Sequence, residues 1–152
     1  MKRLLALAVA VATAAVVFAV FGGAGSASSG GGKRIHVVER ATTDAVVDLG
    51  DSGDSAGDTL TFANEVFDRS NTHSIGTDQG YCFRTVAGEA WECAWTTFLR
   101  KGQITVEGPF YDAADSTLAI TGGTGKYRNA RGWMDLHARS ATEFDFVFHV
   151  IG

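Results

Sequence analysis

Stretches in which apolar and polar residues alternate recur along this chain, and turns rich in glycine and aspartate separate them. The clearest stretch runs from Gln103 to Glu107, where Ile104 and Val106 fall on one side and their polar neighbours on the other. A period of two residues indicates a β-strand with one buried face. Such stretches predict eight strands, which begin near Ile35, Thr59, Thr77, Trp91, Gln103, Ser116, Gly132 and Glu143.

Eight short strands in sequence predict an all-β protein, an eight-stranded antiparallel β-barrel of the up-and-down kind. The interior of such a barrel is filled by side chains or holds one small ligand. A β-sandwich is the structural alternative. Asp44 to Asp58 is rich in aspartate, glycine and serine and predicts a long surface loop. Thr59 to Asp68 predicts one strand, with the polar Asn64 among its apolar positions.

The N-terminus has the pattern of an export signal. Met1 to Arg3 is basic, Leu4 to Phe21 is an unbroken apolar run, and the residues that follow are small. This pattern predicts a signal peptide over residues 1–26, a flexible linker over 27–33, a barrel domain over 34–152, and a secreted protein. The alternative is an uncleaved membrane anchor, because the run approaches the length that spans a bilayer.

Charge and cysteine content fit an exported protein that binds neither nucleic acid nor a membrane surface. Cleavage after residue 26 would remove Lys2 and Arg3 and leave 11 basic and 17 acidic residues, a formal charge of −6. Such a charge argues against nucleic acid and anionic membranes as partners. Cys82 and Cys93 flank a hairpin signal that would place them opposite each other, so we expect a disulfide bond. A reactive free thiol is the alternative.

Two motifs in the second half of the chain resemble known families. The segment from Gly108-Pro109 through an acidic turn to LAITGGTG (residues 118–125) resembles plant allene oxide cyclases. The overlapping GGTGKYRNARG (residues 122–132) looks like the glycine-rich segment of dirigent proteins. Both families share a closed, eight-stranded antiparallel barrel, so the resemblance implies the same fold. It also implies homo-oligomers, either dimers or trimers.

The resemblance to allene oxide cyclases implies where a site would lie. In that family the barrel cavity binds an unstable fatty-acid epoxide, and a glutamate near the end of the first strand assists its ionisation. Glu39 matches this glutamate, Cys82 matches a cavity cysteine, and Leu60, Phe62 and Asn64 match wall positions. Glu39 could instead be a solvated carboxylate at a strand end, and Asn64 a core amide that the neighbouring backbone satisfies.

Other positions depart from the family pattern. Ala41 stands where the family has asparagine, Phe110 stands where it has tyrosine, and the water-holding proline has no counterpart because Pro109 is the only proline. From the dirigent motif, Arg131 matches an arginine that assists ligand binding. Arg131 could instead be a solvated loop charge.

We therefore predict a barrel that binds a small hydrophobic molecule, with Glu39 and Asn64 as catalytic contacts and Leu60, Phe62, Phe110 and Arg131 as substrate-binding residues. The first hypothesis is an isomerase or cyclase that steers a reactive intermediate. The second is a lipocalin-like carrier without turnover, and the third is a filled structural barrel. A pocket of about 300 Å³ or more that is lined by these residues would separate the first two hypotheses from the third. We expect no cofactor and no metal site, since the four histidines show no ligand spacing.

Overall fold

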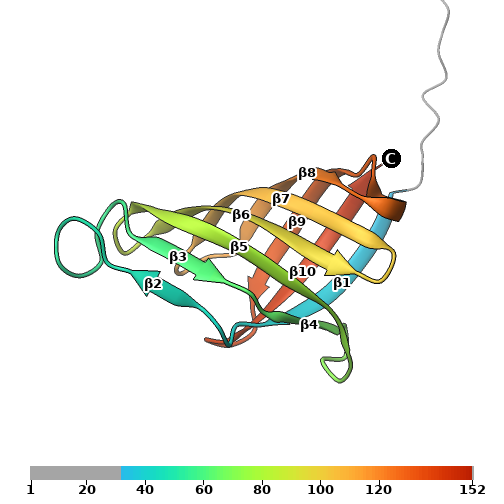
Figure 1. The fold of residues 1–152 in the computed structure, drawn as a ribbon, viewed down its shortest axis with the longest axis horizontal. Coiled ribbons are helices and arrows are strands. Elements are labelled where there is room, and N and C mark those ends of the chain that lie inside the picture. Colours follow the sequence, from blue (N-terminus) through green and yellow to red (C-terminus); the bar gives the residue numbers. More distant parts are fainter. Residues whose placement is uncertain (1–31, 152) are drawn as a thin grey trace, which may run out of the picture.

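Antiparallel strands make up most of residues 32–151, the part of the chain that the computed structural model describes (Figure 1). The predicted signal peptide and nearly all of the predicted linker lie outside the described residues. The elements are β1 (Lys33–Arg40), β2 (Ala45–Val47), β3 (Thr59–Phe62), β4 (Glu65–Asp68), β5 (Ser74–Val86), β6 (Ala90–Leu99), β7 (Gly102–Tyr111), β8 (Ser116–Gly123), the 3-10 helix η1 (Gly125–Tyr127), β9 (Arg131–Ala138) and β10 (Glu143–Ile151).

The strands close into a barrel. Their hydrogen-bonded order is β2-β3-β5-β4-β1-β10-β9-β8-β7-β6, and an additional pairing of β5 with β6 completes the ring. Because β3 and β4 pair with successive lengths of β5, they share one place in the wall, which therefore has eight antiparallel strand positions. The predicted barrel is confirmed, and the β-sandwich alternative is wrong.

One predicted strand is interrupted. The stretch from Thr59 to Asp68 divides at Ala63 and Asn64 into β3 and β4. Asn64 keeps two backbone hydrogen bonds of 3.0 Å with Asp78 of β5, so the wall holds its register there. β1 pairs with β4 on one side of this interruption, and β2 pairs with β3 on the other. The predicted loop from residue 44 to 58 is thus partly wrong, because it contains β2.

The two ends of the barrel differ. The end that carries the β2–β3, β5–β6, β7–β8 and β9–β10 connections is here called the mouth end. Away from the mouth, inward side chains pack the interior completely, and Ile104, Leu118, Met134 and Phe148 have no exposed surface. The hydrophobic effect of burying these four side chains favours the closed barrel by about 1.5–3 kcal/mol each. The packed middle of the barrel therefore leaves room for an inner cavity toward the mouth.

The glycine cluster that follows β8 forms a tight corner at the opposite end. Gly125 has φ of 56°, and a Cβ there would lie 2.5 Å from the carbonyl oxygen of Lys101. A Cβ on Gly123 would lie 2.4 Å from the carbonyl oxygen of Tyr127. This corner therefore needs glycine, for its positive φ at residue 125 and for the close backbone approach at residue 123.

The two cysteines are bonded to each other across the β5–β6 hairpin. Cys82 and Cys93 are direct register partners, and their Cα atoms are 4.0 Å apart. The predicted disulfide is confirmed, and the free-thiol alternative is wrong. Among residues 32–151, no helix is long and apolar enough to cross a membrane.

Candidate functional site

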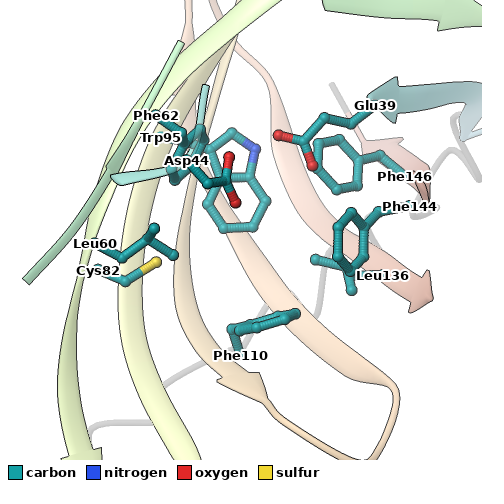
Figure 2. A pocket seen from close by; sticks show the side chains of 10 residues that line it. All are labelled: Glu39, Asp44, Leu60, Phe62, Cys82, Trp95, Phe110, Leu136, Phe144 and Phe146. Atoms are coloured by element: carbon teal, nitrogen blue, oxygen red, sulfur yellow. The ribbon is translucent and has the colours of Figure 1, made fainter. Parts of the chain in front are cut away.

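A cavity opens at the mouth end, on the inner side of the barrel wall. Its lining is mainly aromatic, and two carboxylates line it at one edge (Figure 2). The lining residues are Glu39, Asp44, Leu60, Phe62, Cys82, Trp95, Phe110, Leu136, Phe144 and Phe146. Water-sized molecules can enter about 50 Å³ of this inner cavity, within a hollow of about 380 Å³ that is continuous with solvent.

A wider vestibule lies directly outside the inner cavity. It offers about 820 Å³ to water-sized molecules. The β7–β8 and β9–β10 connections form its walls, and it shares Asp44, Phe110, Leu136 and Phe144 with the inner cavity. Phe110 and Phe144 pack edge to face where the two spaces join, and the centroids of their rings lie 6.0 Å apart. The inner cavity, which the predicted residues line, is smaller than the roughly 300 Å³ that was to separate a ligand-binding barrel from a filled one. A drug-sized ligand would therefore lie mainly in the vestibule with one edge inside.

Glu39 reaches the inner cavity from the end of β1. It faces inward because it alternates with the outward Val38 and Arg40, and its backbone pairs with Phe144 of β10. The residue is only 6% exposed. The alternative of a solvated strand-end carboxylate is therefore wrong, and Glu39 is a buried acid beside an apolar cavity.

Asn64 holds Glu39 in place without lining the cavity itself. Its Nδ2 donates hydrogen bonds to Glu39 Oε1 at 2.9 Å and to Asp44 Oδ1 at 2.8 Å. Its Oδ1 accepts from the backbone N–H groups of Thr42 and Thr43 and from the Thr43 hydroxyl, each at 3.0 Å. These bonds use all of the hydrogen-bonding capacity of the amide. Asn64 is therefore a positioning residue, and its interruption of the strand places two carboxylates side by side.

A second buried carboxyl group stands behind Glu39. Asp78 faces inward from β5 and is 1% exposed. Burial, and next to it the negative charge of Glu39, raises the pKa of Asp78 to about 9. Burial likewise raises the pKa of Glu39 to about 7, with Asp44 adding to the rise and the hydrogen bond from Asn64 opposing it.

The two buried carboxyl groups titrate together. Burial raises the pKa of both, and the negative charge of Glu39 raises the pKa of Asp78 as well. Asp78 Oδ2 is buried and has no hydrogen-bond partner within the described chain. Two buried carboxylates in contact cannot both be ionised cheaply. The pair therefore carries one negative charge at neutral pH and can give or take a proton at the cavity edge.

Trp95 supplies a free hydrogen-bond donor to the same space. The residue is 5% exposed, and its buried Nε1 has no hydrogen-bond partner within the described chain. In Figure 2 the indole nitrogen is turned toward the side of the cavity on which Glu39 lies. The indole can occupy the interior because Gly80 lies opposite it, where a Cβ would come within 2.3 Å of Trp95 Cβ. A bound molecule with an acceptor atom would satisfy this donor.

Arg84 links two loops at the rim of the mouth. Its Nη1 donates hydrogen bonds to both carboxylate oxygens of Asp112, at 2.9 and 2.7 Å, and a carboxylate oxygen of Asp54 lies 2.6 Å from its Nε. It also stacks over the Trp91 ring at 4.0 Å from the centroid. The β2–β3 connection and the β7–β8 connection are thus fixed to the same side chain.

The structure brings together most of the residues that the sequence singled out. Leu60, Phe62, Phe110 and Cys82 line the inner cavity with Glu39. Arg131 does not join them, because it lies at the start of β9, exposed and far along the strand from the mouth. Its guanidinium donates to the carbonyl of Ala130 instead.

Sequence reasoning missed six residues of the site, which are Asp44, Asp78, Trp95, Leu136, Phe144 and Phe146. The two phenylalanines lie on one face of β10, where Phe144, Phe146 and Phe148 alternate with other residues. Asp78 occupies an inward position between Gly76 and Gly80, so an acid at an inward position of a strand was the available signal.

Comparisons with known proteins support the fold assignment. The chain resembles a solved pyocyanin demethylase at 24% identity with a TM-score of 0.67, covering 76% of this chain and all of that one. It resembles AbnU, an exo-specific intermolecular Diels–Alderase, at 17% identity with a TM-score of 0.65, covering 81% of this chain and all of that one. It also resembles the pterocarpan synthase dirigent protein GePTS1 at 18% identity with a TM-score of 0.62, covering 78% of this chain and 89% of that one.

At these identities the structural likenesses establish a shared fold and no shared reaction. Residues 35–146 match the family model described as allene oxide cyclase barrel like domain, and this span includes Glu39, Asn64, Asp78 and all but a few residues of the barrel wall. The chain therefore belongs to the allene oxide cyclase barrel like domain family.

Proposed function

We propose that the mouth of the barrel binds a small hydrophobic molecule and directs its rearrangement, as an isomerase or cyclase does. One observation carries the proposal, namely the two buried carboxyl groups of Glu39 and Asp78, the first of which lines an aromatic cavity that opens to solvent and both of which have raised pKa values. Burying two carboxyl groups costs folding free energy. A perturbed acid in a cleft is a candidate for proton transfer.

The site could act on a bound molecule in two ways. The Glu39–Asp78 pair could protonate an oxygen or nitrogen of the ligand and later recover the same proton, so that the reaction is an isomerisation with no net change in composition. The walls formed by Leu60, Phe62 and Phe110 would hold one conformation of the reacting chain or ring, which favours one stereoisomer. Neither action requires a cofactor.

The solved relatives support a reactive-intermediate role in general terms. They include a Diels–Alderase and a pterocarpan synthase dirigent protein. The alternative is a carrier that uses the same cavity without turnover. We further propose that the protein is exported, because it combines the basic and apolar N-terminal pattern with a disulfide bond.

Ligand binding can be measured through the fluorescence of Trp95. In a Trp91→Phe, Trp133→Phe background its fluorescence reports the inner cavity alone. We expect small planar aromatic molecules to quench it saturably, and Leu60→Phe, which narrows the cavity, to weaken this quenching. Thr121→Ala, on the outer face of β8, is the matched control and should leave it unchanged. If no member of a chemically diverse panel quenches Trp95, the binding proposal fails.

Turnover requires a second measurement. The ratio of product isomers from a candidate rearrangement would be compared for the native protein and Glu39→Gln, which keeps the shape of the side chain. A ratio that shifts with the native protein and returns to the uncatalysed value with Glu39→Gln supports the enzyme. Binding without any change in the ratio supports the carrier.

A further inference from the structure

We infer that the ligand of this site is a planar aromatic molecule that carries a positive charge on its outer side and a hydrogen-bond acceptor on its inner side. The inference rests on the proposed function, because it names the class of molecule that the same cavity would bind. Three features of the mouth support it: its charges, its rings and the free donor of Trp95.

The charged residues that line the mouth are all acidic. Neither the inner cavity nor the vestibule has a lysine, arginine or histidine in its lining. The acidic lining residues are Glu39, Asp44, Asp112 and Asp115. An anionic ligand such as a fatty acid would therefore meet carboxylates and no cation.

The partners of these acids show which charge is left over. Asp112 is neutralised by Arg84, with contacts of 2.9 and 2.7 Å, and Asp115 lies 2.8 Å from His137. Asp44 receives a hydrogen bond from the neutral amide of Asn64, and no cationic side chain of the described chain pairs with it. Asp44 lines both spaces, so its uncompensated charge stands where the vestibule meets the inner cavity.

Aromatic rings surround the same point. Phe62, Trp95, Phe110, Phe144 and Phe146 line the inner cavity, and the Phe62 and Trp95 rings lie 6.1 Å apart. The faces of aromatic rings attract cations within about 6 Å, and flat rings also stack on them. A planar cation gains from both contacts, whereas an aliphatic cation gains from only one.

Trp95 determines the inner end of the ligand. Its Nε1 is buried and unpartnered within the described chain, so a carbonyl, hydroxyl or ether oxygen that enters the inner cavity would accept its hydrogen bond. Only about 50 Å³ is open there, which admits the edge of a ring system and keeps the rest in the vestibule beside Asp44.

Three bicyclic molecules of matched shape test the inference, each with a methoxy oxygen as acceptor. They are 6-methoxyquinoline, which is neutral at pH 7.5, its cationic N-methyl derivative, and the anionic 6-methoxy-2-naphthoate. Binding would be measured by quenching of Trp95 in the Trp91→Phe, Trp133→Phe background. We expect the cation to bind roughly 5- to 30-fold more tightly than the neutral molecule, and the anion to bind more weakly than both.

Asp44→Asn should remove most of the preference for the cation, and rising salt should reduce it in the native protein. Asp51→Asn is the matched control, since it removes the same charge from the exposed β2–β3 connection outside the cavity lining. Circular dichroism would show that both variants are folded.

The outcomes separate the inference from the proposed function. Equal binding of the cation and the neutral molecule, tighter binding of the anion, or a cation preference that survives Asp44→Asn would overturn the inference while binding itself stands. If neither these three molecules nor the wider panel quenches Trp95, the proposed function fails and the inference fails with it.

Discussion

Asn64 donates a 2.9 Å hydrogen bond from its side-chain amide to the carboxyl group of Glu39, which lies 25 residues earlier in the chain. The same amide also fixes Asp44 and the backbone of Thr42 and Thr43. One buried side chain therefore holds the candidate acid, the wall of the cavity and the crossing of the chain from β1 to β2.

Replacement of Asn64 by alanine should destabilise the barrel and release the loop of residues 41–44. Several buried polar groups would lose their partner, so we expect the free energy of unfolding to fall by about 3 kcal/mol. Urea denaturation would measure it. Asn129→Ala, in an exposed turn, should change it by less than about 0.5 kcal/mol. A loss below about 1 kcal/mol for Asn64→Ala would contradict this role.

The Glu39–Asp78 pair predicts a specific dependence of stability on pH. The unfolded pKa values are 4.5 and 3.8, and burial raises the folded values to about 7 and about 9. The folded state thus binds protons more tightly than the unfolded state, and this contribution is complete below about pH 4 and lost as the pH rises through 7 and 9. We expect the free energy of unfolding to decline over this range.

Asp78→Asn tests the same pair, because asparagine keeps the shape of the side chain but cannot ionise. The decline between pH 5 and pH 9 should become shallower by roughly 2–3 kcal/mol. Glu92→Gln, on the outer face of β6, should leave the decline as it is in the native protein. An identical pH profile for Asp78→Asn and the native protein would mean that the two carboxyl groups do not titrate together.

Reduction of the Cys82–Cys93 disulfide should lower stability without opening the barrel. The closed loop spans 11 residues, for which the loop-entropy model gives about 2–3 kcal/mol. Chemical denaturation with and without reductant would measure the difference, and a mass increase of about 2 Da would confirm reduction. Loss of the far-ultraviolet strand signal on reduction alone would show that the bond is required for the fold.

Arg84→Met should loosen the mouth more than the rest of the barrel. Methionine keeps most of the stacking on Trp91 but cannot bind Asp54 or Asp112. We expect a loss of about 2 kcal/mol and faster hydrogen exchange in residues 48–58 and 112–115. Arg100→Met, in an exposed turn at the other end, is the control. Unchanged exchange in both connections would contradict the role of Arg84.

Local pattern was sufficient to predict the barrel. Alternation along Gln103–Glu107 and the hairpin signal between the cysteines depend on near neighbours in sequence, and both predictions are confirmed. The division of Thr59–Asp68 was missed because it depends on Asn64 bonding to residues 42–44, which are distant along the strand pattern.

The site was only partly predictable for the same reason. Glu39 was found by resemblance, but Asp78 comes from β5, and the two approach each other because β1 and β5 both pair with β4. Arg131 was assigned to the ligand because a motif names a residue without saying toward which end of the barrel it lies. The free Nε1 of Trp95 depends on the arrangement of every neighbour and leaves no trace in the sequence.

The chain passes from β1 to β2 at the rim of the barrel, and this connection affects how the entrance can move. β2 pairs with β3 along one edge, and no strand of the described chain pairs with its other edge (Figure 1). On the far side of the entrance, β10 begins only at Glu143, level with Arg40. β3 stays bound to β5, so at this point β2 alone forms the border of the entrance, and a small shift of its free edge would widen the aperture without breaking a ladder to β10.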